Sequence, residues 1–173
     1  ALETVKNLDH SVVLHVLTKK GKGYEPAEKD RSGIYHSVGA FDIVKGIHPV
    51  LDQEKHSWSQ SVSDHVEYLM NKHDDICVIT PAMITGSCLQ RIFKNYPDRS
   101  FDVGIAEEHA MTLAAGLSQG KEFPFLSVYS SFFQRAYDQL NHDIARMNLP
   151  CLIGIDRAGL VGGDGATHHG VFD

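Results

Sequence analysis

The sequence predicts an α/β fold in which helices flank a largely parallel sheet. Short apolar runs typical of strands alternate with helical segments of about 10 to 15 residues, and this alternation implies right-handed crossovers between parallel strands. The helical period is clearest just after Ser57, and the apolar run ICVIT follows that helix directly. A chain of 173 residues with 42% hydrophobic residues also has the ordinary composition of a packed globular unit.

The individual elements follow from the same patterns. At the start we expect a short helix over residues 1–7, a strand over 11–18 and a glycine-rich turn over 19–24. The stretch from Glu25 to about Lys55 lacks periodicity and carries scattered proline and glycine, so we interpret it as an interdomain linker or a segment that covers an active site. Beyond it we expect helices over 57–72, 86–96, 107–117 and 133–148, and strands over 76–80, 100–105, 123–129 and 151–156.

Composition and charge argue against several classes of function. The formal net charge is -6 and Lys and Arg form no dense block, so we expect no nucleic-acid partner. No apolar run approaches the roughly 20 residues that span a bilayer, so we expect no membrane partner. The three cysteines are too widely spaced for a CxxC site and too few for a disulfide framework, which fits a cytoplasmic location. The chain begins without Met, so we expect a processed product or a fragment.

Residues directly after the strands are the first candidates for function, because ligands of open parallel sheets bind at the carboxyl ends of the strands. Glu107 and Glu108 follow the expected strand 100–105, where a helix of small residues begins. Both could simply complement the positive end of the helix dipole, an effect worth roughly 0.3 to 1 kcal/mol each. Alternatively, one carboxyl group is sheltered and exchanges a proton with a bound base while its neighbour faces solvent.

Aromatic residues gather at the expected end of strand 123–129. Tyr129 and Phe132 stand three residues apart across the strand-to-helix turn, close to Arg135. Such aromatics either belong to the core or offer their rings to a planar heterocycle, with Arg135 supplying hydrogen bonds. We expect Glu107 to lie at or near a helix start and to face a pocket shared with Tyr129 and Phe132, since all three would follow adjacent parallel strands.

The segment after the last expected strand, IDRAGLVGGDGATHHGVFD, is rich in glycine and in polar side chains. Glycines permit close approach of the backbone, Arg157 offers a planar fork for phosphate, and Asp164 and His168 can bind hydroxyls or move protons. A plain flexible loop is the alternative. We expect no metal site here, because His168 and His169 are adjacent and no partner pair lies at i, i+4.

Four motifs taken together resemble the 1-deoxy-D-xylulose-5-phosphate synthase family. They are HVLTKKGKGYEPAE, FDVGIAEEHA, YSSFFQRAYDQ and IDRAGLVGGDGATHHGVFD, and their order and spacing match across essentially the whole chain. The family is a group of transketolase-type thiamine-diphosphate transferases that condense pyruvate with glyceraldehyde 3-phosphate and release carbon dioxide. The product feeds isoprenoid, thiamine and pyridoxal biosynthesis. The resemblance implies an enzyme with thiamine diphosphate and Mg²⁺ as cofactors.

The resemblance also implies roles for individual residues. Glu107 would contact ring nitrogen N1′ of the cofactor's aminopyrimidine and so promote removal of the thiazolium C2 proton, whereas Glu108 would lie at the surface. The implied catalytic residues are Glu107, His168 and His36. The implied cofactor contacts are Tyr24, Glu107, Tyr129, Phe132 and Arg135. The implied substrate contacts are Arg157 at the aldehyde phosphate, with Asp164 and His168 near the reacting atoms.

Family members are several times longer than this chain, so the resemblance implies an incomplete thiamine-diphosphate-binding fold. We expect the tail of the diphosphate-binding domain over 1–41, a linker over 42–57 and the first part of the pyrimidine-binding domain over 58–173. The resemblance implies that this chain lacks the upstream region of the family, which carries the G-D-G…N motif that binds the diphosphate through a metal ion. The chain also has EEH where EQH is common. The intact enzyme would be a homodimer, and the fragment itself inactive. The rival hypothesis is a non-catalytic α/β module that binds a small phosphorylated ligand or a partner.

Overall fold

The computed structural model describes residues 2–30, 34–35, 38, 41–47, 57–161 and 165–173. The chain divides into two compact units, Ala1–Leu51 and Asp52–Asp173, and each is described by itself. The division falls inside the stretch predicted as a linker, while the predicted domain boundaries themselves stay a prediction. No helix in the described ranges is both long enough and apolar enough to cross a membrane.

The first unit contains two short helices, α1 (Leu2–Lys6) and α2 (Glu25–Lys29). The predicted strand over 11–18 is wrong: this segment forms no ladder, and Val13 and Leu17 are 95% and 85% exposed. A strand needs a neighbour for its backbone groups, and none of the described residues of this unit pairs with it. The prediction of an unstructured stretch from Glu25 is also wrong at its start, because a proline in the first turn of α2 is compatible with a helix start.

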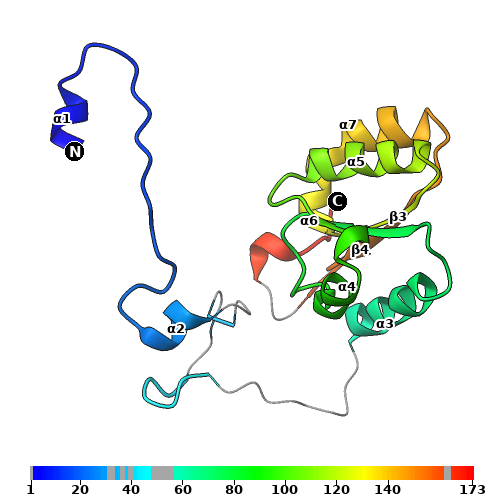
Figure 1. The fold of residues 1–173 in the computed structure, drawn as a ribbon, viewed down its shortest axis with the longest axis horizontal. Helices are drawn as coiled ribbons and strands as arrows, with labels where there is room; N and C mark the ends of the chain where they lie inside the picture. The colour runs from blue at the N-terminus through cyan, green and yellow to red at the C-terminus, as the bar shows by residue number, and fades with distance from the viewer. Residues whose placement is uncertain (1, 31–33, 36–37, 39–40, 48–56, 162–164) are drawn as a thin grey trace. The chain divides into compact units, whose positions relative to one another are not determined.

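The second unit is built around four parallel strands in the order β2-β1-β3-β4 (Figure 1). The strands are β1 (Ile76–Thr80), β2 (Ser100–Asp102), β3 (Phe123–Tyr129) and β4 (Leu152–Asp156). The predicted parallel α/β architecture is therefore confirmed. The first two crossovers each contain a helix, namely α4 (Gln90–Asn95) between β1 and β2 and α5 (Glu107–Gln119) between β2 and β3.

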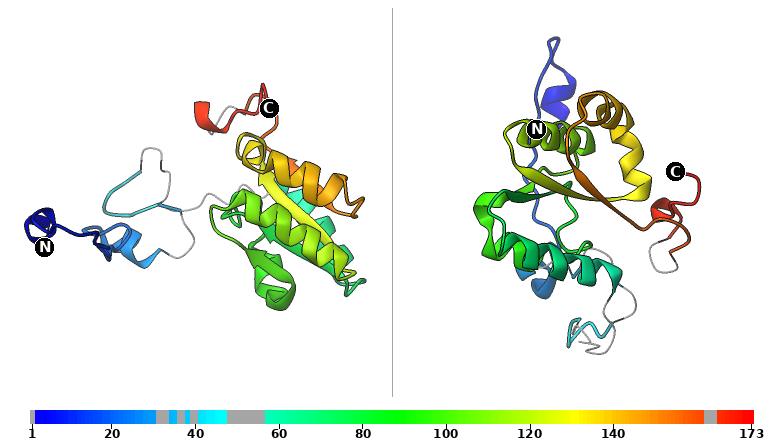
Figure 2. Two further views of the ribbon diagram at one scale, coloured as in Figure 1. Left: turned by 90° about the horizontal axis from the view of Figure 1, so that it is seen from above. Right: turned by 90° about the vertical axis from the view of Figure 1, so that its right-hand side faces the viewer.

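Helices cover both faces of this sheet, as Figures 1 and 2 show. On one face α3 (Trp58–Met70) and α4 pack on Val78 and Phe125, and on the other α5 packs on Ile79 and Leu126. Neighbouring residues of one strand thus point to opposite layers, as the pleat requires. The central strands β1 and β3 are buried along most of their length, which explains their continuous apolar runs.

Three predicted elements have different bounds in the structure. The helix predicted over 86–96 begins only at Gln90, after a series of turns, and the strand predicted over 100–105 ends at Asp102. The helix predicted over 133–148 begins earlier and changes pitch along its length. It comprises α6 (Ser130–Phe133), a 3-10 turn (Gln134–Ala136), α7 (Tyr137–Gln139) and a π-helical segment (Leu140–Ala145).

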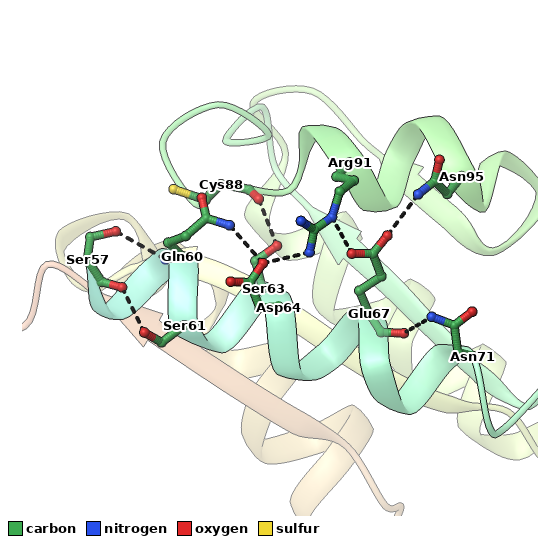
Figure 3. A network of polar contacts seen from close by, with 10 residues as sticks. All are labelled: Ser57, Gln60, Ser61, Ser63, Asp64, Glu67, Asn71, Cys88, Arg91 and Asn95. Carbon is green, nitrogen blue, oxygen red and sulfur yellow. Dashed lines mark hydrogen bonds and ion pairs between the residues drawn. The ribbon is translucent and has the colours of Figure 1, made fainter. Parts of the chain in front are cut away.

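A network of polar contacts ties α3 to α4 (Figure 3). The Glu67 carboxylate accepts hydrogen bonds from Arg91 Nε and, at 2.8 Å, from Asn95 Nδ2. Arg91 Nη2 also donates to Asp64 Oδ1 at 2.6 Å, and Gln60 Nε2 donates to the same oxygen at 2.9 Å. Each carboxylate in this network has more than one donor, so the two helices are joined by paired and shared charges.

Candidate functional site

The described site residues of the second unit lie around the carboxyl ends of the strands. Tyr129 is the last residue of β3, and it is paired in register with Asp156, the last residue of β4. Arg157 follows Asp156 directly, and Glu107 begins α5 a few residues after β2. The fold therefore places these side chains at the edge of the sheet where parallel α/β proteins bind their ligands.

Glu107 and Glu108 have different environments although they are adjacent in the sequence. Helix α5 begins at Glu107, as predicted, and both carboxylates lie in its first turn, where the helix dipole favours negative charge. The Glu107 side chain is 2% exposed, whereas Glu108 is exposed. The expectation that one carboxyl is sheltered while its neighbour faces solvent is therefore confirmed.

Only one of the two oxygen atoms of the Glu107 carboxylate accepts a hydrogen bond from a described residue. Its Oε1 accepts a hydrogen bond from Arg135 Nη1 at 2.7 Å. Its Oε2 is buried and has no hydrogen-bond partner among the residues that the structure describes. A buried acceptor without a donor is costly, so an atom of this kind in a folded protein calls for an explanation such as an absent ligand.

An aromatic cluster lies next to this ion pair. The rings of Tyr129 and Phe132 are stacked at 6.0 Å between centroids, and the His168 ring meets both edge-on, at 5.9 Å and 5.1 Å. The Arg135 guanidinium lies 4.9 Å from the centroid of the Phe132 ring. Arg135 therefore connects the buried carboxylate to the aromatic cluster.

One geometric expectation about this site is wrong. Glu107 and the two aromatic residues do not follow adjacent strands, because β1 lies between β2 and β3. The carboxylate is linked to the rings through Arg135 and does not face bulk solvent. A small cavity of about 110 Å³ lies elsewhere, between α3 and strands β3 and β4, and none of the predicted site residues that the structure describes lines it.

Arg157 is held firmly at the end of β4. Its Nη1 donates to Asp156 Oδ2 at 2.7 Å and to the Gly86 carbonyl at 3.1 Å, and its guanidinium lies 4.3 Å from the Tyr129 ring centroid. Its backbone has φ of 59°, a left-handed conformation that non-glycine residues seldom adopt. Ser59 Oγ adds a hydrogen bond of 2.6 Å to Asp156 Oδ2, which ties the start of α3 to the same group.

Sequence reasoning missed the contribution of Gly86. A Cβ atom at this position would lie 1.7 Å from the Tyr129 hydroxyl, so the absence of a side chain makes room for that ring. Gly86 stands at the start of a stretch that was predicted to be helical, where a glycine is tolerated, so no signal in the sequence revealed this contact.

The remaining predicted site residues belong to the first unit or lie outside the described residues. Tyr24 belongs to the first unit, where it packs with Tyr35 and Phe41 and its hydroxyl donates to the Ile43 carbonyl at 2.9 Å. Desolvation, and then the Tyr35 hydroxyl, raise the pKa of Tyr24. His36 and Asp164 lie outside the described residues.

The structure offers no evident metal or thiol chemistry at the described positions. Among them no group of three His, Cys, Asp or Glu side chains could hold a metal ion. Cys77 and Cys151 are free, and burial raises the pKa of each thiol to about 11. A thiol with so high a pKa is a poor nucleophile near neutral pH.

Comparisons with known proteins show the family to which this chain belongs. The family described as "Transketolase, pyrimidine binding domain" matches residues 54–173. The chain belongs to this family. The pyrimidine-binding domain thus contains the whole candidate site of the second unit, from Ser59 to His168.

Proteins similar to the chain extend beyond the pyrimidine-binding domain. Proteins named 1-deoxy-D-xylulose-5-phosphate synthase from Bacillus licheniformis, Listeria monocytogenes and Macrococcus caseolyticus are 52%, 51% and 49% identical to it, over 99%, 99% and 100% of its length. The chain spans 27–28% of the length of these relatives. A solved structure titled as a split-gene transketolase, an inactive beta4 tetramer, is 28% identical with a TM-score of 0.54, over 64% of this chain and 35% of that one.

Proposed function

We propose that the chain is the aminopyrimidine-binding part of a thiamine-diphosphate-dependent 1-deoxy-D-xylulose-5-phosphate synthase, a transferase of isoprenoid and thiamine biosynthesis. The intact enzyme would condense pyruvate with glyceraldehyde 3-phosphate and release carbon dioxide. Relatives with that name are 51–52% identical to the chain over 99% of its length. The observation that carries the proposal is the buried Glu107 carboxylate, with one oxygen bound by Arg135 and the other without a donor.

The residues of the site fit the aminopyrimidine end of the cofactor. An aminopyrimidine needs a buried group that shares a proton with its ring nitrogen, and Glu107 Oε2 is such a group. It also needs an apolar wall, which Tyr129 and Phe132 would provide. When bound, thiamine diphosphate supplies a carbon nucleophile for the pyruvate carbonyl. The task of Glu107 is to hold a proton at the ring nitrogen while the surrounding side chains exclude water.

The proposed substrate end of the site lies at the end of β4. Arg157 would bind the phosphate of glyceraldehyde 3-phosphate, which is supported by its position after β4 and by a guanidinium already oriented by Asp156. His168 would lie near the reacting atoms, beside Phe132. The proposed roles of Tyr24, His36 and Asp164 rest on the resemblance alone, and so do Mg²⁺, a homodimer and a cytoplasmic location.

The test is a matched pair of substitutions in the intact protein. Glu107→Gln should lower the rate of synthesis from pyruvate and glyceraldehyde 3-phosphate by about 10² to 10⁴, because that is the usual contribution of general acid-base catalysis. Glu108→Gln changes an exposed carboxylate of the same helix turn and should leave the rate within about twofold of wild type. Equal rates for wild type and Glu107→Gln would contradict the proposal.

The isolated chain of 173 residues gives a second expectation. It should show no synthase activity and bind thiamine diphosphate weakly, because a diphosphate held with Mg²⁺ needs oxygen ligands around the ion and the described residues form no such cluster. Isothermal titration with Mg²⁺ present measures this directly. Micromolar binding by the isolated chain would show that the diphosphate site is here after all.

A further inference from the structure

Two polar side chains from distant parts of the sequence meet beside Arg157. Ser59 lies in the first turn of α3, and its Oγ donates to Asp156 Oδ2 at 2.6 Å. The same oxygen accepts a hydrogen bond from Arg157 Nη1 at 2.7 Å. Asp156 Oδ2 therefore joins the start of α3 to the guanidinium that follows β4.

The other oxygen of Asp156 holds the backbone at the same point. Its Oδ1 accepts a hydrogen bond from the Arg157 backbone N–H at 2.8 Å. Arg157 has φ of 59°, and a residue with a side chain keeps such a conformation only where its surroundings hold it there. One carboxylate thus fixes both the backbone and the side chain of Arg157.

These bonds limit the directions in which the guanidinium can point. Arg157 Nη1 also donates to the Gly86 carbonyl at 3.1 Å, and the guanidinium carbon lies 4.3 Å from the Tyr129 ring centroid. A free arginine side chain has many rotamers, and a ligand that binds it must offset the entropy lost when one rotamer is selected. Here the rotamer is selected on folding, before any ligand binds.

A carboxylate beside an arginine has two opposing effects on a bound phosphate. It repels the phosphate, because both groups are anions. It also orients the guanidinium fork, on which bidentate binding of a phosphate depends. The Arg157 and Asp156 side chains are 19% and 24% exposed, so water screens both effects less than it would at an open surface. The two effects predict opposite results when the charge of Asp156 is removed.

We propose that Asp156 and Ser59 are positioning residues that hold Arg157 in the orientation that binds the phosphate of the aldehyde substrate. This inference rests on the proposed function, in which Arg157 contacts that phosphate. Asp156 holds the guanidinium directly, and Ser59 holds Asp156 from α3. Neither residue needs to touch the substrate, so both act on its affinity and not on the chemical step.

The experiment compares the Michaelis constants of the two substrates in the intact protein. Asp156→Asn keeps Oδ1 as the acceptor for the backbone N–H and replaces Oδ2 by an amide group that accepts from neither Ser59 nor Arg157. The KM for glyceraldehyde 3-phosphate should rise about tenfold, while kcat and the KM for pyruvate stay within about twofold of wild type. Loss of repulsion alone would lower the KM for glyceraldehyde 3-phosphate, and a lowered or unchanged value would overturn the inference.

Substitutions of Ser59 leave both charges in place and remain informative if Asp156→Asn fails to fold. Ser59→Ala should raise the KM for glyceraldehyde 3-phosphate about threefold, and Ser59→Thr, which keeps the hydroxyl, should restore the wild-type value. Ser61→Ala is the matched control on the same helix, where Ser61 Oγ donates to the Ser57 carbonyl at 3.2 Å (Figure 3), and it should behave as wild type. Equal KM values for Ser59→Ala and Ser61→Ala, or a parallel change in the KM for pyruvate, would overturn the role of Ser59.

Arg157→Met separates this inference from the function on which it rests. The KM for glyceraldehyde 3-phosphate should rise about a hundredfold in this variant, and adding Asp156→Asn or Ser59→Ala should raise it no further. No rise for Arg157→Met would overturn the phosphate contact and with it this inference. A rise for Arg157→Met without a rise for Asp156→Asn and Ser59→Ala, or a further rise in the double variants, would overturn the positioning role and leave the proposed function standing.

Discussion

The second unit contains two buried glutamates that are each bound by a half-exposed arginine. The two carboxylates differ in how many of their oxygen atoms accept a hydrogen bond. Glu67 on α3 receives Arg91 at one oxygen and Asn95 at the other. Glu107 on α5 receives Arg135 at one oxygen, and its second oxygen has no donor in the described part of the chain. The arginine side chains are similar in exposure, at 56% and 47%.

The difference separates a structural ion pair from a candidate catalytic one. Both oxygens of Glu67 are used in joining α3 to α4, so that carboxylate is complete without a ligand (Figure 3). Glu107 Oε2 lacks a donor among the described residues, and a buried acceptor without a hydrogen bond destabilises the ligand-free protein. Such local cost is typical of binding sites, where a ligand supplies the missing partner.

The largest expected effect on stability comes from removing the arginines. Arg135→Met leaves Glu107 with no partner, and we expect a loss of about 2 to 3 kcal/mol in the free energy of unfolding, below the range for a fully buried pair because the guanidinium is half exposed. Arg91→Met should lose only about 1 kcal/mol, because Glu67 keeps Asn95 and Asp64 keeps Gln60. Urea unfolding of both variants measures the difference in the free energy of unfolding. Equal losses for the two variants would contradict this prediction.

A second test changes the carboxylates instead. Glu67→Gln should destabilise the chain by about 1 kcal/mol, because an amide cannot accept from Arg91 and Asn95 with both of its terminal atoms. Glu107→Gln should change stability by less than about 0.5 kcal/mol, since it removes a buried charge and retains one acceptor for Arg135. A larger loss of unfolding free energy for Glu107→Gln than for Glu67→Gln would show that Glu107 has a structural role.

A separate effect concerns high pH and provides a common reference for all these variants. Burial raises the pKa of Cys77 and Cys151 to about 11, above the value of about 9 expected in the unfolded chain. Above pH 9 the unfolded chain therefore binds fewer protons than the folded one, so stability is full below pH 9 and falls as pH rises towards 11. Melting temperatures at pH 8, 9 and 10 should fall in parallel for wild type and the arginine variants. A Cys77→Ser, Cys151→Ser double variant should show a smaller fall.

Patterns within the sequence predicted the central strands of the sheet better than the segments outside the sheet. The apolar runs of β1 and β3 carry enough local information, because both faces of these strands are buried. The strand predicted over 11–18 failed because pairing depends on a neighbour, which an apolar run does not specify. The helix predicted from Gly86 begins only at Gln90, because the chain passes through turns before it and Cys88 has φ of 58°, which an α-helix does not contain.

The sequence predicted residues of the candidate site but not the contacts between their side chains. The position of Glu107 at a helix start follows from the local pattern. The pattern left open which of Glu107 and Glu108 is sheltered, and only the family resemblance assigned the surface position to Glu108. The bond from Arg135 to Glu107 joins residues on separate elements, and it depends on the relative placement of α5 and the segment after β3. Sequence spacing alone does not determine such a side-chain direction.

The unpaired segment over 11–18 has a consequence for how the isolated chain behaves in concentrated solution. Val12, Val13, Leu14, Val16 and Leu17 are all exposed, and none of the residues from 11 to 18 is an acid, a lysine or a proline. A short β-prone segment of this kind is a template for edge-to-edge association, because the backbone groups of one molecule can pair with those of another. Self-association should therefore begin at this segment, and a lysine in place of Val13 would act as a gatekeeper against it.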